Sequence, residues 1–155
     1  MFDSASPPQS TAVIHGVDRL IIDAAPDGIL LVDPQGLILL GNPALEQITG
    51  YTAAELHGQS LGIFLPPEMR EQHQRQMAGY FLKPKRRRMG QVARLDLRHR
   101  DGRMVPVGIA LGHCEVAGVP CAVAFIRDLS DLRRLEAQIE YQALHDTLTG
   151  LSNRW

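Results

Sequence analysis

Apolar residues follow a helical spacing near the start of the chain and a strand-like pattern directly after it. Residues 11–25 place apolar side chains three or four positions apart, which predicts an N-terminal helix that ends before Pro26. Residues 28–32 and 37–40 are two short apolar runs, and the turn-forming residues 33–36 separate them. Two such runs around a tight turn predict a β-hairpin.

Helix signals occupy the stretch that follows this hairpin. Asn42 and Thr52 are suitable N-terminal caps for two short helices, expected over residues 43–50 and 53–58. Thr52 also begins the spacing of a capping box, in which an acidic residue follows three positions later. A longer amphipathic helix is predicted over residues 66–81.

Strand signals return in the second half of the chain. Three apolar segments are separated by turn residues at positions 101–102 and at Gly118. Residues 105–111 place apolar side chains at alternate positions, and the last segment covers residues 122–126. Two strands, several short helices and then three strands predict the α+β fold class. The expected form is a five-stranded antiparallel sheet with short helices on one face and a flanking helix at each end.

The last predicted helix carries a narrow apolar stripe. Ser130 is its expected cap, and the helix should cover residues 131–145. Leu132, Leu135 and Ile139 have the spacing of a coiled-coil seam, with charged residues between them. One domain alone would not bury so narrow a stripe, so we expect a signalling helix and a homodimer that forms through the flanking helices.

Composition limits the classes of function. The 155 residues are 45% hydrophobic, which is enough for one ordinary domain with a buried core. No run approaches the ~18 apolar residues of a membrane span, and residues 1–10, rich in Ser and Pro, are expected to form a flexible leader. The formal net charge of −1 gives no general attraction to nucleic acid. Cys114 and Cys121 are expected to be small apolar residues in a hairpin of a cytoplasmic protein.

Five short stretches of the chain match one known pattern. They are residues 25–29, 42–44, 49–58, 100–102 with Pro106, and 125–130. Together, over residues 17–130, they resemble a PAS sensor domain. The resemblance implies a regulatory module in which Asp128 and Ser130 hold the helix that leads to an effector.

The end of the chain carries a second motif. Residues 145–154 read His-Asp-Thr-Leu-Thr-Gly-Leu-Ser-Asn-Arg, which resembles the first motif of GGDEF (diguanylate cyclase) domains. Residues 146–155 would then be the start of a truncated GGDEF domain, and the loop that gives this family its name is not in the chain. The chain is therefore expected not to be an enzyme itself. It would be the regulatory part of a diguanylate cyclase or phosphodiesterase, with a cyclic-di-GMP output.

His73 is the candidate for cofactor chemistry. On the predicted helix, Met69, Met77 and Tyr80 lie at positions i−4, i+4 and i+7, so the imidazole shares an apolar face with them. The residues alone favour a core histidine that a backbone carbonyl satisfies. However, residues 65–73 resemble the helix that bears the proximal haem ligand in oxygen-sensing PAS proteins of the rhizobial histidine kinase type. That resemblance implies haem b, with His73 as the axial ligand of the iron.

The same resemblance assigns roles beyond this helix. Ile109 and Leu111 correspond to apolar residues over the distal haem face, and Gln91 corresponds to a distal methionine of a related subfamily. The family's oxygen-stabilising arginine would fall at Ala93, whereas Arg94 should point to the other face if the strand is regular. The implied signal is a diatomic gas (O2, CO or NO) or a redox change, and the sequence does not distinguish among these signals.

The basic run at residues 83–88 has three interpretations: a solvated loop, a nucleic-acid contact, or a contact to haem propionates through an arginine such as Arg87. The propionate contact fits its position directly after the His73 helix, and the near-neutral net charge disfavours nucleic acid. Flavin is disfavoured because the segment that holds the reactive cysteine in light-sensing relatives has no Cys here. The alternative function is a cofactor-free or other small-ligand PAS domain that acts in dimerisation and signal transmission.

Overall fold

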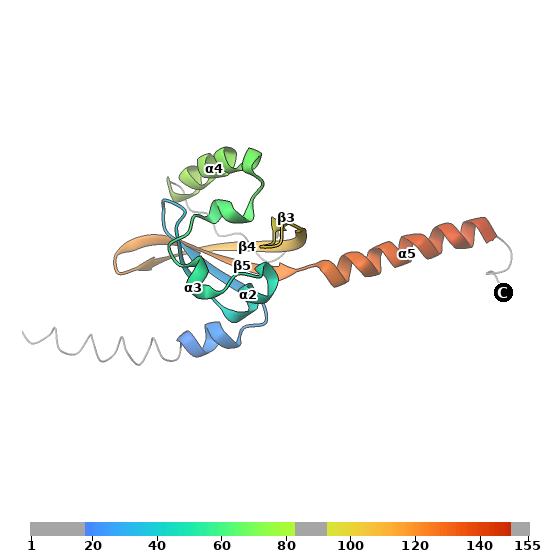
Figure 1. Cartoon of the computed structure of the whole chain (residues 1–155), viewed down its shortest axis with the longest axis horizontal. Coiled ribbons are helices and arrows are strands. Elements are labelled where there is room, and N and C mark those ends of the chain that lie inside the picture. Colours follow the sequence, from blue (N-terminus) through green and yellow to red (C-terminus); the bar gives the residue numbers. More distant parts are fainter. Residues whose placement is uncertain (1–17, 83–92, 150–155) are drawn as a thin grey trace, which may run out of the picture.

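Residues 18–82 and 93–149 are described by the computed structural model, and their five strands form one antiparallel sheet in the order β2-β1-β5-β4-β3 (Figure 1). The strands are β1 (Gly28–Val32), β2 (Ile38–Gly41), β3 (Ala93–Arg98), β4 (Met104–Val116) and β5 (Val119–Asp128). β1 pairs with both β2 and β5, so the N-terminal hairpin joins the three C-terminal strands. The predicted α+β class and five-stranded antiparallel sheet are confirmed.

Short helices connect the second strand to the third. They are α2 (Pro43–Thr49), α3 (Ala53–Leu56), the 3-10 helices η2 (Leu61–Phe64) and η3 (Pro67–Met69), and α4 (Arg70–Leu82). A helix over residues 18–24 precedes the sheet, and α5 (Ser130–Thr149) projects from the domain as one long helix (Figure 1). Within the two described ranges, no helix combines the length and the apolar character that crossing a bilayer requires.

Strand alternation gives the sheet two different faces. The inner face forms the core with α2, α3, η2 and the partly buried side chains of α4. Its buried members are Leu30, Val32, Ile38, Leu97, Val105, Val107, Ala122 and Ile126 of the strands, with Leu45, Ile48, Leu56 and Phe64 of the helices. Residues one position away on the same strands, such as Arg94 and Phe125, point to the outer face.

Asn42 connects three elements at the edge of this core. Its side-chain oxygen accepts hydrogen bonds from the backbone N–H of Ile29 at 2.8 Å and of Leu45 at 3.0 Å. Its amide group donates to the backbone carbonyls of Ile22 at 2.9 Å and of Asp27 at 3.0 Å. These four bonds satisfy the whole buried amide. The predicted cap of α2 is therefore confirmed, and the same residue also ties the N-terminal helix to β1.

Some boundaries differ from those predicted from the sequence. The helix expected from Pro66 begins as η3, and α4 begins only at Arg70. Pro66 itself has extended backbone (ψ 145°), because the following Pro67 disfavours the helical conformation at the residue before it. Ser130 is not the capping residue of α5; the Asp128 carboxylate accepts a hydrogen bond from the Ser130 N–H at 2.8 Å instead. α5 also continues to Thr149, beyond the expected end at residue 145, so no break in the helix separates it from the start of the C-terminal motif.

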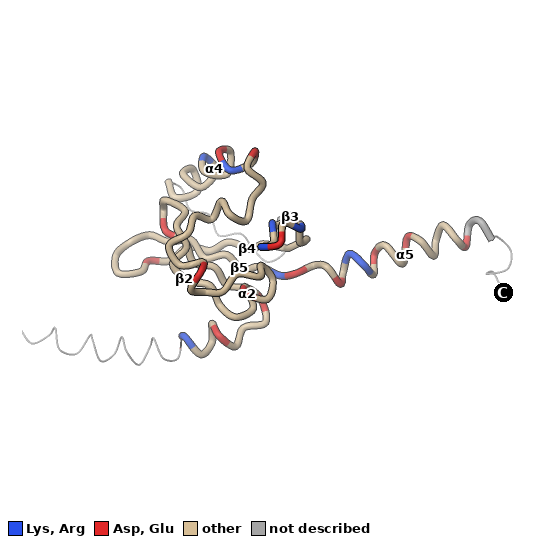
Figure 2. Tube along the Cα trace, viewed as in Figure 1, with Lys and Arg blue, Asp and Glu red and all other residues tan. Residues whose placement is uncertain are grey.

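Three parts of the chain lie outside the described residues: 1–17, 83–92 and 150–155. They contain the expected leader, the basic run with Arg87, the candidate Gln91 and the end of the C-terminal motif. Among the described residues, Figure 2 shows charged positions on β3 and a mixture of acidic and basic positions along α5.

Candidate functional site

His73 lies on α4, where it lines a small cavity between this helix and the turn that joins β1 to β2. The cavity measures about 80 Å³, and its other walls include Gly36 of the turn, Leu61 of η2 and Met77 of α4. A Cβ atom added to Gly36 would lie 3.5 Å from the sulfur of Met77, so Met77 packs directly over the turn. His73 and Met77 are thus brought together, as their helical spacing predicts.

The surroundings of His73 favour the neutral imidazole. Burial lowers the pKa of His73 below its ordinary value of 6.5, because a charged ring would lose part of its hydration. At neutral pH the ring is therefore mainly uncharged. A neutral imidazole has one nitrogen with a lone pair, which can accept a hydrogen bond or coordinate a metal ion.

A few side chains in the second half of α4 hold this helix against the domain. None of its residues is buried, and Met77, Tyr80 and Phe81 are only partly buried against the core. The rings of Tyr80 and Phe81 meet edge to face, with centroids 5.7 Å apart. Met69 lies on η3, not on α4, and is 48% exposed. Met69 directly precedes α4 and is not among the residues that line the cavity at His73, so its place on the face of His73 stays a prediction.

The strand residues that the haem resemblance singles out lie on the inner face of β4, and they are not among the residues that line the cavity at His73. Ile109 and Leu111 lie on the same face as the buried Val107, and both are only partly buried. Leu95 pairs with Val107 and also points inward, yet it is 48% exposed. An inward-facing leucine this exposed means that the helices leave the inner face at β3 incompletely covered. Apolar surface therefore remains available on this part of the sheet.

A haem group requires an axial nitrogen, apolar surfaces and sufficient volume. His73 supplies the nitrogen, while Met77 and Tyr80 on the helix and Ile109 and Leu111 on the sheet supply apolar surface. The cavity of about 80 Å³ is far smaller than the roughly 300–1,000 Å³ of typical ligand pockets. The donor chemistry therefore fits haem, and the volume requires that α4 move away from the sheet. α4 has no fully buried residue, so such a movement would expose only its partly buried side chains, those of Met77, Tyr80 and Phe81.

Arg94 lies on the outer face, as strand alternation predicts. It stands opposite Gly108 of β4, and its guanidinium nitrogen lies 3.6 Å from the carboxylate of Glu136 on α5. Two residues further along β3, Asp96 forms an ion pair with Arg133 of α5, also at 3.6 Å. Arg94 is therefore on the opposite side of the sheet from His73. Both ion pairs instead connect β3 to the helix that leaves the domain.

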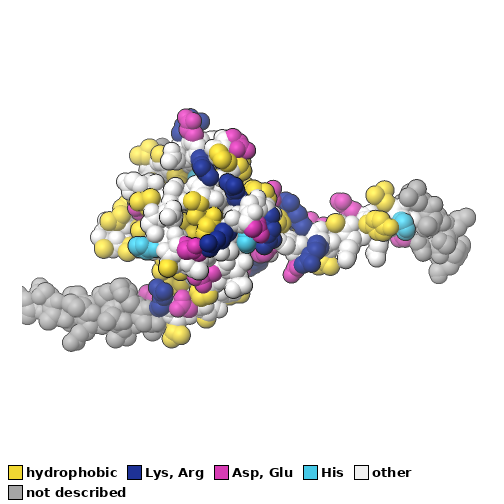
Figure 3. Space-filling view, viewed as in Figure 1, with side chains coloured by type: hydrophobic (Ala, Val, Ile, Leu, Met, Phe, Trp, Pro, Cys, Tyr) yellow, Lys and Arg dark blue, Asp and Glu magenta, His cyan; other side chains and the backbone are white. Residues whose placement is uncertain are grey.

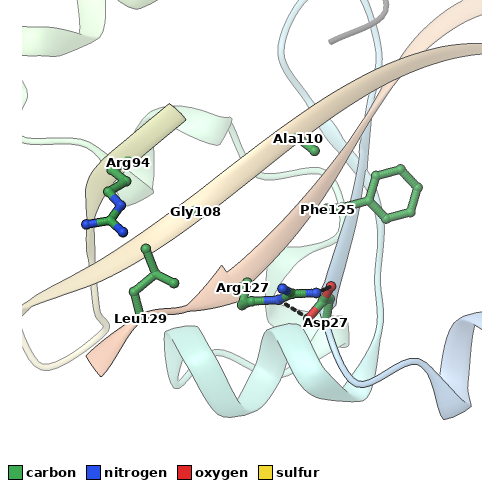
Figure 4. Close-up of a pocket in the computed structure, with 7 residues that line it drawn as sticks. All are labelled: Asp27, Arg94, Gly108, Ala110, Phe125, Arg127 and Leu129. Atoms are coloured by element: carbon green, nitrogen blue, oxygen red, sulfur yellow. Dashed lines mark hydrogen bonds and ion pairs between the residues drawn. The ribbon is translucent and has the colours of Figure 1, made fainter. Parts of the chain in front are cut away.

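A larger hollow of about 320 Å³ lies on the outer face of the sheet (Figure 4). The small residues Gly108 and Ala110 line it together with Phe125. Arg127 donates two hydrogen bonds to the Asp27 carboxylate, both at 3.1 Å, on another wall of the hollow. Sequence reasoning missed this feature because the two partners are 100 positions apart. Only the pairing of β1 with β5 brings them together.

Comparisons with known proteins agree with a sensory role. The family model described as PAS fold matches residues 18–129. Sensor protein FixL of Bradyrhizobium diazoefficiens is 26% identical over 122 residues, which cover 79% of this chain and 24% of FixL. Oxygen sensor protein DosP of Escherichia coli is 26% identical over 103 residues, which cover 66% of this chain and 13% of DosP.

Solved structures give the same fold. The crystal structure of a PAS domain from Desulfitobacterium hafniense superposes with a TM-score of 0.61 at 26% identity, covering 71% of this chain and 99% of that domain. The chain spans about a quarter or less of the length of FixL and DosP. The chain therefore corresponds to only a part of each of these two relatives.

Proposed function

The chain belongs to the PAS fold family, and from this membership we propose that residues 18–129 form a haem-binding sensor of a diatomic gas or of redox state. The PAS fold is sensory and regulatory, and no catalytic domain is present in the part of the chain that the structure describes. The similarity to FixL and to the oxygen sensor DosP supports the proposal.

The observation that carries this proposal is the setting of His73. Its imidazole is partly buried, and burial lowers its pKa, so the ring is neutral when a metal ion would bind. The helix that bears it contacts the core only through partly buried side chains. A histidine with a purely structural role would be expected on a helix that is firmly packed. Here the packing of α4 is incomplete, and a bound group would complete it.

Several residues around His73 would contact bound haem. When bound, haem would supply the iron that takes up the diatomic ligand. His73 would hold this iron from the side of α4, with Met77 and Tyr80 against the porphyrin. Ile109 and Leu111 would exclude water from the opposite side. A shift in the position of bound haem would then move α4, a helix of the sensor that has no fully buried residue.

We also propose that α5 carries the signal to a domain that makes or degrades cyclic-di-GMP. The helix runs from the end of β5 into the motif that resembles a GGDEF domain. Leu132, Leu135 and Ile139 remain exposed along it, and a second copy of the helix would cover them. A ligand at His73 regulates this output only if it favours one packing of the paired helices over another.

The small volume of the cavity beside His73 favours a second candidate function. At about 80 Å³ it holds a few atoms and not a large cofactor. In this case the domain would work without haem, as a dimerisation and transmission module. The two candidates differ in whether α4 opens to admit a porphyrin.

Reconstitution with haem distinguishes the two candidates. The whole chain is titrated with ferric haem b, and the Soret absorbance is followed for wild type, His73→Ala and His113→Ala. His113 is an exposed histidine of β4, so its replacement is the matched control. We expect wild type and His113→Ala to saturate at about one haem per chain and His73→Ala to take up none, because one axial nitrogen holds the iron. A wild-type chain that gains no Soret band would rule the haem proposal out and leave the transmission module.

A further inference from the structure

The two cysteines of the described chain face each other across the β4–β5 hairpin. Cys114 of β4 is the direct cross-strand partner of Cys121 of β5, two residue pairs from the pair Val116–Val119 that closes the turn. Directly opposed residues point to the same face of a sheet, with Cβ atoms about 4.5–5.5 Å apart. This spacing is close to that of a disulfide, whose Cβ atoms lie about 3.5–4.5 Å apart.

We propose that Cys114 and Cys121 form a reversible redox site, in which a low-molecular-weight disulfide such as oxidised glutathione converts the dithiol to an intramolecular disulfide. The site stands independently of haem binding, because neither cysteine lines the cavity at His73. Its consequence lies in β4, which carries Cys114 three positions after Leu111. A bond at this end of the hairpin would constrain the strand that also carries Ile109 and Leu111.

The different exposure of the two thiols fixes the order of the reaction. Cys114 is exposed, so its thiolate attacks oxidised glutathione first, and one glutathione leaves as the thiolate. Cys121 is buried and has Cys114 directly beside it. Its thiolate then attacks the Cys114 sulfur of the mixed disulfide, and the second glutathione leaves. Two protein thiols are oxidised, one disulfide is reduced to two thiols, and the two protons pass to the departing glutathiones.

The strand register makes the expected bond easy to reduce again. Pro120 has no N–H, so its pair with Glu115 is not hydrogen-bonded, and the neighbouring cysteine pair occupies a hydrogen-bonded position. Such pairs have Cα atoms about 5.5 Å apart, with side chains farther apart than at the alternate positions. Closing the bond must draw the two Cβ atoms together against the ladder. A strained disulfide of this kind is a better oxidant than a structural one, so ordinary thiols reopen it.

The sulfur of Cys121 must also leave a contact that it has in the dithiol form. Its S–H donates to the backbone carbonyl of Val119 at 3.5 Å. Burial raises the pKa of both thiols, with smaller contributions to Cys121 from Cys114 and Asp33. Both features keep the dithiol unreactive until an oxidant is present in excess. The site would therefore respond to strongly oxidising conditions and stay reduced otherwise.

Thiol–disulfide exchange on the whole folded chain tests this site. Wild type, Cys114→Ser and Cys121→Ser are incubated with oxidised glutathione at about pH 8.5, near the ordinary pKa of a thiol. Intact mass and free-thiol titration are then measured. We expect wild type to become lighter by about two mass units, to lose both free thiols and to recover them with dithiothreitol. Cys121→Ser should stop at the glutathione adduct, and Cys114→Ser should stay unmodified because its remaining thiol is buried.

Three results would overturn the proposal. They are a wild-type chain that keeps a stable glutathione adduct, one that keeps both thiols free, and one that forms disulfide-linked dimers on a non-reducing gel. Circular dichroism of each sample checks that the reaction occurs in the folded chain. An adduct on Cys114→Ser would show that Cys121 is reached by glutathione directly, which contradicts the proposed order.

Discussion

The inner and outer faces of the sheet are built from alternate residues of the same strands, but they differ in what covers them. On β5, Ile126 is 1% exposed in the core, whereas its neighbour Phe125 is 40% exposed on the outer face. On β3, Leu97 belongs to the core, whereas Arg94 reaches the helix α5. The inner face forms the core with the short helices, and the outer face carries contacts to the helix that leaves the domain. A single strand thus contributes one residue to the core and the next residue to the outer face.

The largest effect is expected from breaking the inner face of β5. Ile126→Ala removes a fully buried side chain from the core and should lower the free energy of unfolding by about 2–5 kcal/mol. Phe125→Ala, the matched change on the outer face, should lower it by only about 1 kcal/mol, because much of that ring is already in water. Chemical denaturation of both variants measures the difference. Equal losses would mean that the outer face is covered as well as the inner one.

The next effect concerns the apolar stripe of α5. Hydrophobic side chains are visible along this helix in Figure 3, and Leu135 is 56% exposed. Leu135→Lys should shift the protein from dimer to monomer, because a lysine in the seam would be desolvated without a partner. Ala137→Lys, on the opposite side of the same helix, should leave the dimer unchanged. Sedimentation of both variants at low protein concentration is the measurement. If Leu135→Lys sediments as the same dimer as wild type, the dimer seam does not include Leu135.

A smaller effect is expected from the ionisation of His73. Because burial lowers its pKa in the folded state, the unfolded chain binds the proton more readily as the pH falls below the ordinary value of 6.5. The free energy of unfolding should therefore decrease between about pH 7 and pH 5.5. His73→Leu should flatten this part of the profile, whereas Gln74→Leu on the same helix should keep the wild-type slope. Identical slopes in all three proteins would show that His73 is not desolvated.

The smallest effect is expected from Arg94. Because its side chain is on the outer face, Arg94→Leu should leave the haem spectrum and the rate of gas release unchanged. The variant removes only an exposed ion pair with Glu136, and such pairs contribute about 0–1 kcal/mol. Stopped-flow release of oxygen from the reconstituted protein is the measurement. If oxygen leaves the variant faster, Arg94 must contact the ligand from the inner face. That result would contradict the register of β3.

The elements of this fold follow from signals that are local in the sequence. Asn42 is a residue type that favours helix N-caps, and it caps α2. The alternation of apolar residues along β4 and β5 identifies the buried face of each strand. The opposite orientation of Arg94 also follows from alternation alone. In contrast, no local signal in the sequence indicates the 3-10 helix η3 that precedes α4 and carries Met69. The Asp27–Arg127 pair depends on which strands become neighbours, and no local pattern contains that information.

Chemical rescue at His73 tests the assignment of the iron ligand directly. Glycine at this position removes the imidazole and leaves space beside Met77 for a free imidazole molecule. The chain with His73→Gly is titrated with haem, with and without added imidazole, and the Soret band is recorded. We expect no specific haem uptake without imidazole and a restored band, at about one haem per chain, with it. A His73→Gly chain that binds haem like wild type in the absence of imidazole would contradict the assignment of His73 as the iron ligand.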